Sequence, residues 1–201
     1  MTSLNTGLIM FSGKKILLCI AVMICIRSLD GFAQCIILVN PNYTVTYNTK
    51  TNLAEEVDWI ITPNNLGRLP RKNVRFQTDW RTPRPRANTK HYTRSGYQRG
   101  HLCPSADFNA RYDLMRSTYL LSNIVPMRDT INCGSWYRTE VRCRAEAIKL
   151  GGVRVKAFTA ITTPDTIYMK GTPIAIPNVL RKELWTLTGD SLITQWYFIQ
   201  K

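Results

Sequence analysis

Three short segments between residues 98 and 140 constrain this chain more than any other feature. The first is Gln98–His101, which reads Gln-Arg-Gly-His and holds one of only two histidines in 201 residues. Residues 122–126 (Ser-Asn-Ile-Val-Pro) come next, and Asn132 and Glu140 follow. Together they supply a base, a cation, an amide oxygen for a hard metal ion and a carboxylate. These are the groups that metal-assisted cleavage of a phosphodiester requires.

The charge of the chain favours an anionic partner. Lys and Arg number 27 against 13 Asp and Glu, which gives a net charge of +14. Such an excess is typical of proteins that bind nucleic acid or an anionic surface, although a generic basic protein would share it. The length indicates one domain, and 44% hydrophobic residues suffice for a core.

The first thirty-three residues resemble a secretory signal peptide. Lys14 and Lys15 precede an apolar run at residues 16–26, which is shorter than the roughly 20 residues of a membrane span. Gly31-Phe32-Ala33 offers a small-x-small cleavage site. We therefore expect a signal peptide at 1–33 and a secreted or periplasmic domain at 34–201, without stable membrane insertion after cleavage. The alternative is an uncleaved anchor.

The expected mature domain keeps its basic character and has four cysteines. Removing residues 1–33 leaves a net charge of +12. Cys35, Cys103, Cys133 and Cys143 remain, and an exported protein can pair four cysteines in three ways. Cys133 and Cys143 lie about 15 Å apart if they share one helix, too far for a bridge. No two cysteines have the close spacing of a zinc site.

Periodicity predicts both strands and a helix. Residues 43–47 alternate as a half-buried strand does, and residues 57–62 form a second expected strand. Residues 63–94 are rich in Pro, Asn and Arg, which predicts a basic loop: either a solvated segment or a rim that contacts phosphates.

The C-terminal half continues this mixture of strands and helices. A helix is expected from Asn132 to Leu150, ended by Gly151 and Gly152. Residues 153–161 predict a central strand, and residues 192–199 a closing strand. Residues 177–185 fit either a short helix or an extended segment.

The three segments resemble the DNA/RNA non-specific endonucleases, a family that includes endonuclease G. The family hallmark is Asp-Arg-Gly-His, here Gln98–His101, and residues 122–126 match the next conserved block. A third block is matched by Asn132, Gly134, Trp136 and Glu140. The resemblance extends from Tyr43 to the C-terminus. It implies an α+β fold, with a mixed, mainly antiparallel central sheet flanked by helices and a ββα-metal (His-Me) finger.

The resemblance also implies a metal-dependent endonuclease that hydrolyses DNA and RNA with little sequence specificity. His101 is the expected general base, because histidine is the side chain whose ordinary pKa suits proton transfer near neutrality. The alternative is a structural core histidine. His91 matches no block and is expected to be a loop residue.

Asn132 is the expected ligand of a single Mg²⁺ ion, with Mn²⁺ as the alternative metal. An amide oxygen is a hard donor, and Mg²⁺ keeps several waters, so that one protein ligand can suffice. The alternative is a helix N-cap, for which Asn is well suited.

Glu140 is an expected catalytic residue, with His101 and Arg99. It lies eight residues after Asn132, about 80° around an ideal helix and two turns along, so both side chains can face one cleft. The resemblance implies that it acts on the metal through water, whereas a surface carboxylate among arginines is the alternative. Trp136, between the two, is expected to pack in the core.

The remaining site residues bind phosphate or support the site. The guanidinium fork of Arg99 is matched to oxyanions and is expected to bind the scissile phosphate, unless it forms a structural ion pair. Arg75 lies near the position where relatives carry a further phosphate-binding arginine, with a register open by one residue. Asn123 matches a family position that supports the site from behind.

Gln98 is the one departure from the pattern, since the family has aspartate there. Glutamine keeps hydrogen bonding but loses the charge. The alternative function is therefore a catalytically weakened relative that binds DNA or RNA without efficient cleavage.

Overall fold

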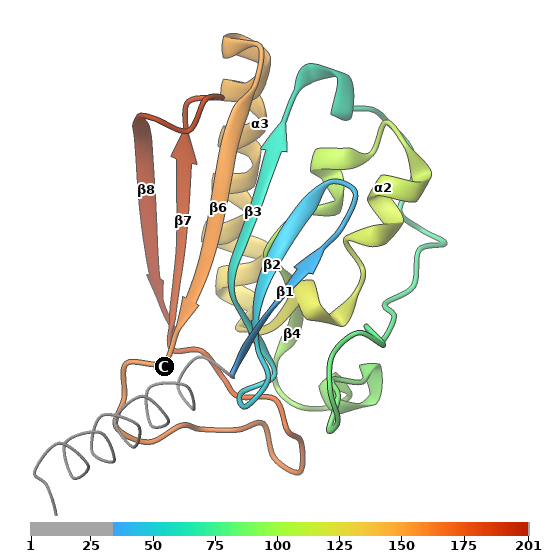
Figure 1. The fold of residues 1–201 in the computed structure, drawn as a ribbon, viewed down its shortest axis with the longest axis vertical. Coiled ribbons are helices and arrows are strands. Elements are labelled where there is room, and N and C mark those ends of the chain that lie inside the picture. The colour runs from blue at the N-terminus through green and yellow to red at the C-terminus, as the bar shows by residue number, and fades with distance from the viewer. Residues whose placement is uncertain (1–33, 201) are drawn as a thin grey trace, which may run out of the picture. The chain divides into compact units, whose positions relative to one another are not determined.

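A six-stranded antiparallel sheet is the centre of the computed structural model, which describes residues 34–200. Every pair of neighbouring strands in the sheet is antiparallel, and the order is β1-β2-β3-β6-β7-β8 (Figure 1). The strands are β1 (Cys35–Val39), β2 (Tyr43–Asn48), β3 (Leu53–Ile61), β6 (Val153–Ala160), β7 (Val179–Trp185) and β8 (Leu192–Ile199). The expected α+β class with a mainly antiparallel sheet is confirmed.

A smaller unit of two strands and a helix is inserted between β3 and β6. Strands β4 (Gln98–His101) and β5 (Ile124–Met127) form an antiparallel pair. The helix that follows begins with π-helical turns at η5 (Thr130–Trp136) and continues as α3 (Tyr137–Leu150). This is the ββα arrangement that the resemblance implied.

Short helical segments connect these elements. They are η1 (Pro63–Asn65), η2 (Thr89–Tyr92), η3 (Ser105–Phe108), α2 (Tyr112–Ser117) and η4 (Leu121–Asn123). Between η1 and η2 the chain has no helix or named strand, and its only ladder contact is a bridge from Gln77 to Leu120. The predicted basic loop is therefore confirmed for most of its length.

Helix α3 packs on one face of the sheet, and this face holds the core. Alternation along β6 buries Val153, Val155 and Ala157 completely, and Cys143 and Ala147 of α3 are buried with them. Burial of such apolar surface is the main stabilising contribution to the fold. In Figure 1, α3 runs behind the strands. It ends at Gly151, whose φ of 76° is the left-handed conformation expected of a helix-terminating glycine.

The opposite face of the sheet carries charged side chains that pair diagonally across β3 and β6. Arg154 pairs with Asp58, and Lys156 Nζ lies 3.0 Å from Glu56 Oε1. Among residues 34–200, no helix packs over these ion pairs, which explains why this face can remain polar.

Of the two alternatives for residues 177–185, the extended one is confirmed from Val179 onward, because β7 is held between β6 and β8. Two other elements differ from the expected bounds. The strand expected at 57–62 begins at Leu53 in a hairpin with β2. The helix expected from Asn132 begins two residues earlier and is π-helical at first.

The four cysteines within residues 34–200 are all free thiols, so none of the three possible pairings occurs here. No helix within residues 34–200 is long and apolar enough to cross a membrane. The expected signal peptide at 1–33 lies outside the described residues.

Candidate active site

The β4–β5 pair sets the position of the Arg-Gly-His segment. Gly100 pairs with Val125 and His101 with Ile124. A Cβ atom on Gly100 would lie 2.7 Å from Met127 Cβ, closer than real atoms approach, so the close contact of the two strands requires glycine. Because side chains alternate along a strand, Arg99 and His101 share one face of β4.

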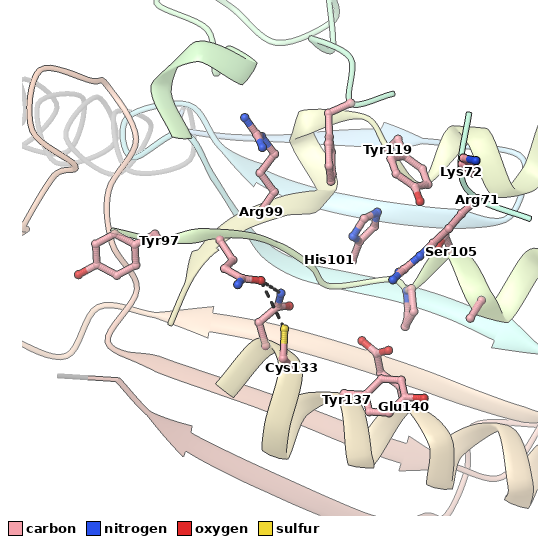
Figure 2. A pocket seen from close by; sticks show the side chains of 15 residues that line it. Arg71, Lys72, Tyr97, Arg99, His101, Ser105, Tyr119, Cys133, Tyr137 and Glu140 are labelled. Atoms are coloured by element: carbon pink, nitrogen blue, oxygen red, sulfur yellow. Dashed lines mark hydrogen bonds between the residues drawn. The ribbon is translucent and has the colours of Figure 1, made fainter. Parts of the chain in front are cut away.

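That face opens into a pocket of about 850 Å³ (Figure 2). Its walls come from the basic loop, β4, η3 and the start of the finger helix. The lining residues are Arg71, Lys72, Phe76, Tyr97, Gln98, Arg99, His101, Pro104, Ser105, Ala106, Tyr119, Asn132, Cys133, Tyr137 and Glu140. The expected residues His101, Arg99, Glu140 and Asn132 therefore meet in one pocket.

His101 is held by aromatic contacts and one backbone hydrogen bond. Its ring lies 4.8 Å from that of Tyr119, nearly perpendicular to it, and 5.4 Å from that of Phe76, centroid to centroid. Its carbonyl oxygen accepts a hydrogen bond of 3.0 Å from Trp136 Nε1. The imidazole Nε2 is buried and has no hydrogen-bond partner in the described protein.

This environment keeps the imidazole neutral. Burial, together with the nearby charge of Arg71, lowers the pKa of His101 to about 3. A neutral histidine with an unpartnered ring nitrogen is a free proton acceptor. The structural-histidine alternative predicts instead a nitrogen tied to a neighbour.

Glu140 faces the same pocket from α3 (Figure 2). Burial raises the pKa of its carboxyl group to about 7, while the positive charge of Lys182 opposes the rise. Lys182 lies on β7, is fully buried, and its Nζ atom is 3.9 Å from the centroid of the Trp136 ring. Glu140 is therefore a desolvated carboxyl group that interacts electrostatically with a buried cation, and not the exposed surface residue of the alternative.

Asn132 lies inside the helix and is not its N-cap. Its backbone N–H donates to Arg128 O at 2.9 Å, as a residue in a helical turn does. Its side-chain Nδ2 donates to Gln98 Oε1 at 2.8 Å. Its Oδ1 accepts no hydrogen bond from any described residue, so that the amide oxygen remains available to a cation.

Gln98 links Asn132 to a carboxylate. Its Nε2 donates to Asp129 Oδ1, and its Oε1 accepts from Asn132 Nδ2 and from Cys133 Sγ at 3.5 Å. The latter two bonds are the dashed lines in Figure 2. Gln98 therefore orients the side chain of Asn132 through its own carbonyl oxygen.

Arg99 stands beside His101 at the wall of the pocket. Its Nη2 donates to Thr89 O at 2.9 Å, and its guanidinium lies over the rings of Phe76 and Tyr92, 5.4 and 5.7 Å from their centroids. No ion pair among the described residues includes Arg99, which removes the structural ion-pair alternative for residues 34–200. Its Nε is buried and has no hydrogen-bond partner in the described protein, a donor that an oxyanion in the pocket would satisfy.

The family model of the DNA/RNA non-specific endonucleases matches residues 23–200 of this chain. The chain belongs to that family. A likeness in fold agrees with it: the crystal structure of the EndoG/EndoGI complex, which concerns inhibition of EndoG, superposes with a TM-score of 0.70. That match covers 82% of this chain and 74% of the other at 20% identity, so it shows a shared fold.

Relatives in sequence are nucleases. Mitochondrial nuclease EXOG of Danio rerio is 34% identical over 115 residues, which are 57% of this chain and 33% of that protein. A nuclease of Nostoc sp. is 31% identical over 110 residues, 54% of this chain and 40% of that protein. The mitochondrial nuclease of Saccharomyces cerevisiae is 35% identical over 113 residues, again 54% of this chain and 34% of the relative. The matched region thus spans about a third to two fifths of each relative.

Two further residues of the family pattern lie outside the pocket. Arg75 does not line it, whereas Arg71 and Lys72 of the same loop do. Asn123 is fully buried behind β4: its Oδ1 accepts from Cys103 N at 2.9 Å, and its Nδ2 donates to Cys103 O and to Thr118 O. Asn123 therefore fixes the turn that follows His101, in keeping with a supporting position.

The remaining expectations for single residues are met. Trp136 is fully buried, as expected of a core residue. His91 lies in η2, where its Nδ1 accepts a hydrogen bond from Asn88 N at 3.1 Å, and it does not line the pocket.

The sequence interpretation did not identify Phe76 and Tyr119, which contact His101, or the buried Lys182. Nothing in the pattern around Phe76 or Tyr119 marks them as neighbours of His101, because their contact depends on how the loop folds. The burial of Lys182 could have been inferred from the alternation along β7. Lys182 lies between Leu180 and Leu184 on the alternating positions of β7, and these three side chains are all completely buried.

Proposed function

We propose that this protein is a metal-dependent endonuclease that hydrolyses phosphodiester bonds of DNA and RNA with little sequence specificity. One observation carries the proposal: a neutral, unpartnered His101 nitrogen shares a pocket with the free amide oxygen of Asn132 and the carboxyl group of Glu140. Membership of the non-specific endonuclease family supports the same reaction.

His101 is the general base in this proposal. Its neutral imidazole accepts the proton of the water that attacks phosphorus, and the phenyl and phenol rings beside it hold the ring in place. Since the pKa of His101 is held low by burial, the base is in its accepting form throughout the neutral range.

Arg99, Arg71 and Lys72 supply positive charge around the phosphate. Arg99 carries a planar fork suited to two phosphoryl oxygens, and its position over Phe76 and Tyr92 limits its motion. Arg71 and Lys72 are exposed at the mouth of the pocket and attract the nucleic-acid backbone.

The donors in the pocket fit a hard cation such as Mg²⁺. Among residues 34–200 no three His, Cys, Asp or Glu side chains cluster as a metal-binding group, which disfavours a closed zinc-type site. Asn132 Oδ1 would hold the ion directly, and Glu140 would contact it through water. When bound, the cation neutralises negative charge on the phosphoryl and leaving oxygens.

The weakened-relative alternative rested on Gln98. The hydrogen bond from Asn132 Nδ2 to Gln98 Oε1 favours the active form, since the side chain that would hold the metal is still oriented by residue 98. The lost negative charge is partly replaced by Asp129, which accepts from Gln98 Nε2.

Export to a secreted or periplasmic location is part of the proposal. It rests on the basic flank and the apolar run at residues 16–26, followed by Gly31-Phe32-Ala33. Several relatives are mitochondrial, so the location is tested on its own. N-terminal sequencing of the exported protein should begin at Gln34, whereas an intact N-terminus would contradict cleavage.

Plasmid digestion tests the activity. Purified protein should nick supercoiled DNA and degrade RNA with Mg²⁺ or Mn²⁺, and EDTA should stop both reactions. Cleavage that persists in EDTA would remove the metal from the mechanism. Binding without cleavage in any metal would support the weakened relative.

A further inference from the structure

A tryptophan stands exposed on the loop that precedes the catalytic strand. Trp80 has 73% of its surface accessible to solvent, whereas Trp59 and Trp136 are buried in the core. It borders a separate hollow of about 470 Å³, whose other walls include Thr78, Arg84 and Asn88. An exposed aromatic ring beside a hollow is typical of a ligand-binding surface.

Arg86 is fixed over this ring. Its guanidinium carbon lies 5.3 Å from the centroid of Trp80, a cation–π arrangement. Its Nε donates to Thr82 O and its Nη2 to Trp80 O at 3.2 Å, so that the loop's own backbone holds the guanidinium. The other N–H groups of Arg86 remain free for an anion.

The positive charges of this hollow are uncompensated. No ion pair among residues 34–200 includes Arg84 or Arg86. Arg81 differs, because its Nη2 lies 2.7 Å from Asp79 Oδ2. Asp79 also accepts from Ser122 Oγ at 2.7 Å, which ties the root of the loop to η4. Trp80 is thus exposed on an anchored segment that carries two unpaired arginines.

At both ends of the segment that lines the hollow, the chain leads within two residues to a residue that contacts the catalytic site. Thr78 follows Phe76, which touches His101, by two residues, or about 7 Å of extended chain. Asn88 precedes Thr89, whose carbonyl oxygen accepts from Arg99. A strand whose phosphate lies at His101 and Arg99 can therefore reach the hollow within a few nucleotides.

We propose that Trp80 and Arg86 form a stacking subsite for an unpaired nucleobase of the substrate strand. The inference rests on the proposed nuclease function and adds a substrate preference to it. Every base has a π-face, so that stacking on an aromatic ring binds single strands without reading their sequence. Duplex DNA keeps its bases stacked on one another and presents only their edges, so the subsite favours single-stranded or locally opened nucleic acid.

Binding to a catalytically inactive background tests the subsite. In a His101→Ala protein, binding of the single strands dT8 and dA8 should quench tryptophan fluorescence. Adding Trp80→Ala should remove the quenching and weaken single-strand binding about tenfold, while duplex affinity changes less than about twofold. Trp80→Phe keeps a stacking ring and should retain most of the affinity. Tyr197→Ala is the matched control, because Tyr197 is 58% exposed on β8 at the far edge of the sheet.

Each outcome supports or overturns the stacking subsite. Unchanged single-strand affinity in Trp80→Ala overturns the subsite, and so does an equal loss with Tyr197→Ala. An equal loss on duplex overturns the preference for unpaired bases. If the wild-type protein neither binds nor cleaves any nucleic acid, the proposed function itself fails. If it cleaves plasmid while Trp80→Ala behaves as its parent, only the subsite fails.

Discussion

His101 and Glu140, the floor of the catalytic pocket, are desolvated, whereas at its rim Gln98 and Arg71 are exposed to water and Asn132 is half-buried beside them. On the floor, burial changes the pKa of each ionisable group. At the rim, a chain of hydrogen bonds from Asp129 through Gln98 to Asn132 sets geometry instead. The two regions are therefore expected to respond differently to substitution: the floor through protonation, the rim through orientation.

Burial acts on the two floor residues with opposite sign. It lowers the pKa of His101 to about 3 and raises that of Glu140 to about 7, since in both cases it disfavours the charged form. The positive charge of the buried Lys182 limits the rise in the pKa of Glu140. In the metal-free protein His101 is therefore neutral, and Glu140 titrates near neutrality.

The largest effect is expected from His101→Ala. Loss of the general base should lower the rate of plasmid cleavage by about 10²–10⁴-fold. Folding should change little, because Trp136 binds the backbone carbonyl of residue 101 and not its side chain. Cleavage rate, circular dichroism and DNA binding would be measured together. A variant that retains more than a tenth of the wild-type rate would falsify the role of His101.

The second prediction concerns stability against pH in EDTA. The folded pKa of Glu140, about 7, exceeds its ordinary value of 4.5, so the folded state holds the proton more tightly than the unfolded state. This contribution favours folding below pH 4.5 and is lost as pH rises through 7. Glu140→Gln should remove it. The difference in unfolding free energy between wild type and variant should therefore shift by up to about 3 kcal/mol between pH 4.5 and 8.

Urea unfolding at pH 4.5 and pH 8 measures this shift. His101 also contributes to the pH dependence of stability, with the opposite sign. Its folded pKa of about 3 lies below the ordinary value of 6.5, so its contribution to stability is lost as pH falls below 6.5. Both proteins carry that term and it cancels in the difference. A difference that does not vary with pH would mean that Glu140 is ionised and solvated in the metal-free protein.

Asn132→Ala tests the rim. Removing the amide oxygen should raise the Mg²⁺ concentration needed for half-maximal rate by about tenfold or more, by analogy with the 10–100-fold losses caused by perturbing residues around metal ligands. Thermal stability should fall only slightly, since Asn132 is not a helix cap. Asn132→Asp is the matched control, because it keeps an oxygen donor. A stability loss with an unchanged metal requirement would restore the capping interpretation.

Much of the fold could be predicted from local pattern. The alternation at residues 43–47 and 153–161 gave β2 and β6, and Gly151 gave the end of α3. The extended state of β7 could not be decided, because Arg181-Lys182-Glu183 interrupt its apolar positions and only pairing with β6 and β8 fixes it. The π-helical turns at Thr130–Trp136 have no sequence signal, since they depend on how the finger closes on β4.

The candidate site, too, could be predicted only in part from the sequence. His101, Asn132 and Glu140 were predicted from the resemblance of their short segments to the family pattern, and the structure brings all three into one pocket. Arg71 lines the pocket whereas the expected Arg75 does not, because the path of the loop is set by tertiary contacts, such as the Gln77–Leu120 bridge, that no local pattern encodes. Lys182 comes from a strand distant in sequence, and its buried charge contradicts ordinary residue preference.

The smallest effect is expected from Gln98→Asp, which restores the family residue at the rim. An aspartate could still accept from Asn132 Nδ2, but it could not donate to Asp129, and two carboxylates would then lie close together. We therefore expect the cleavage rate of the single variant to change by no more than about threefold. Combining it with Asp129→Asn removes the repulsion between the two carboxylates, and a larger change is then expected. Rates across a Mg²⁺ series for the single and double variants would separate the two causes. A tenfold or greater gain in the single variant would show that the missing charge had weakened this enzyme, and that the hydrogen bond from Gln98 to Asn132 does not replace it.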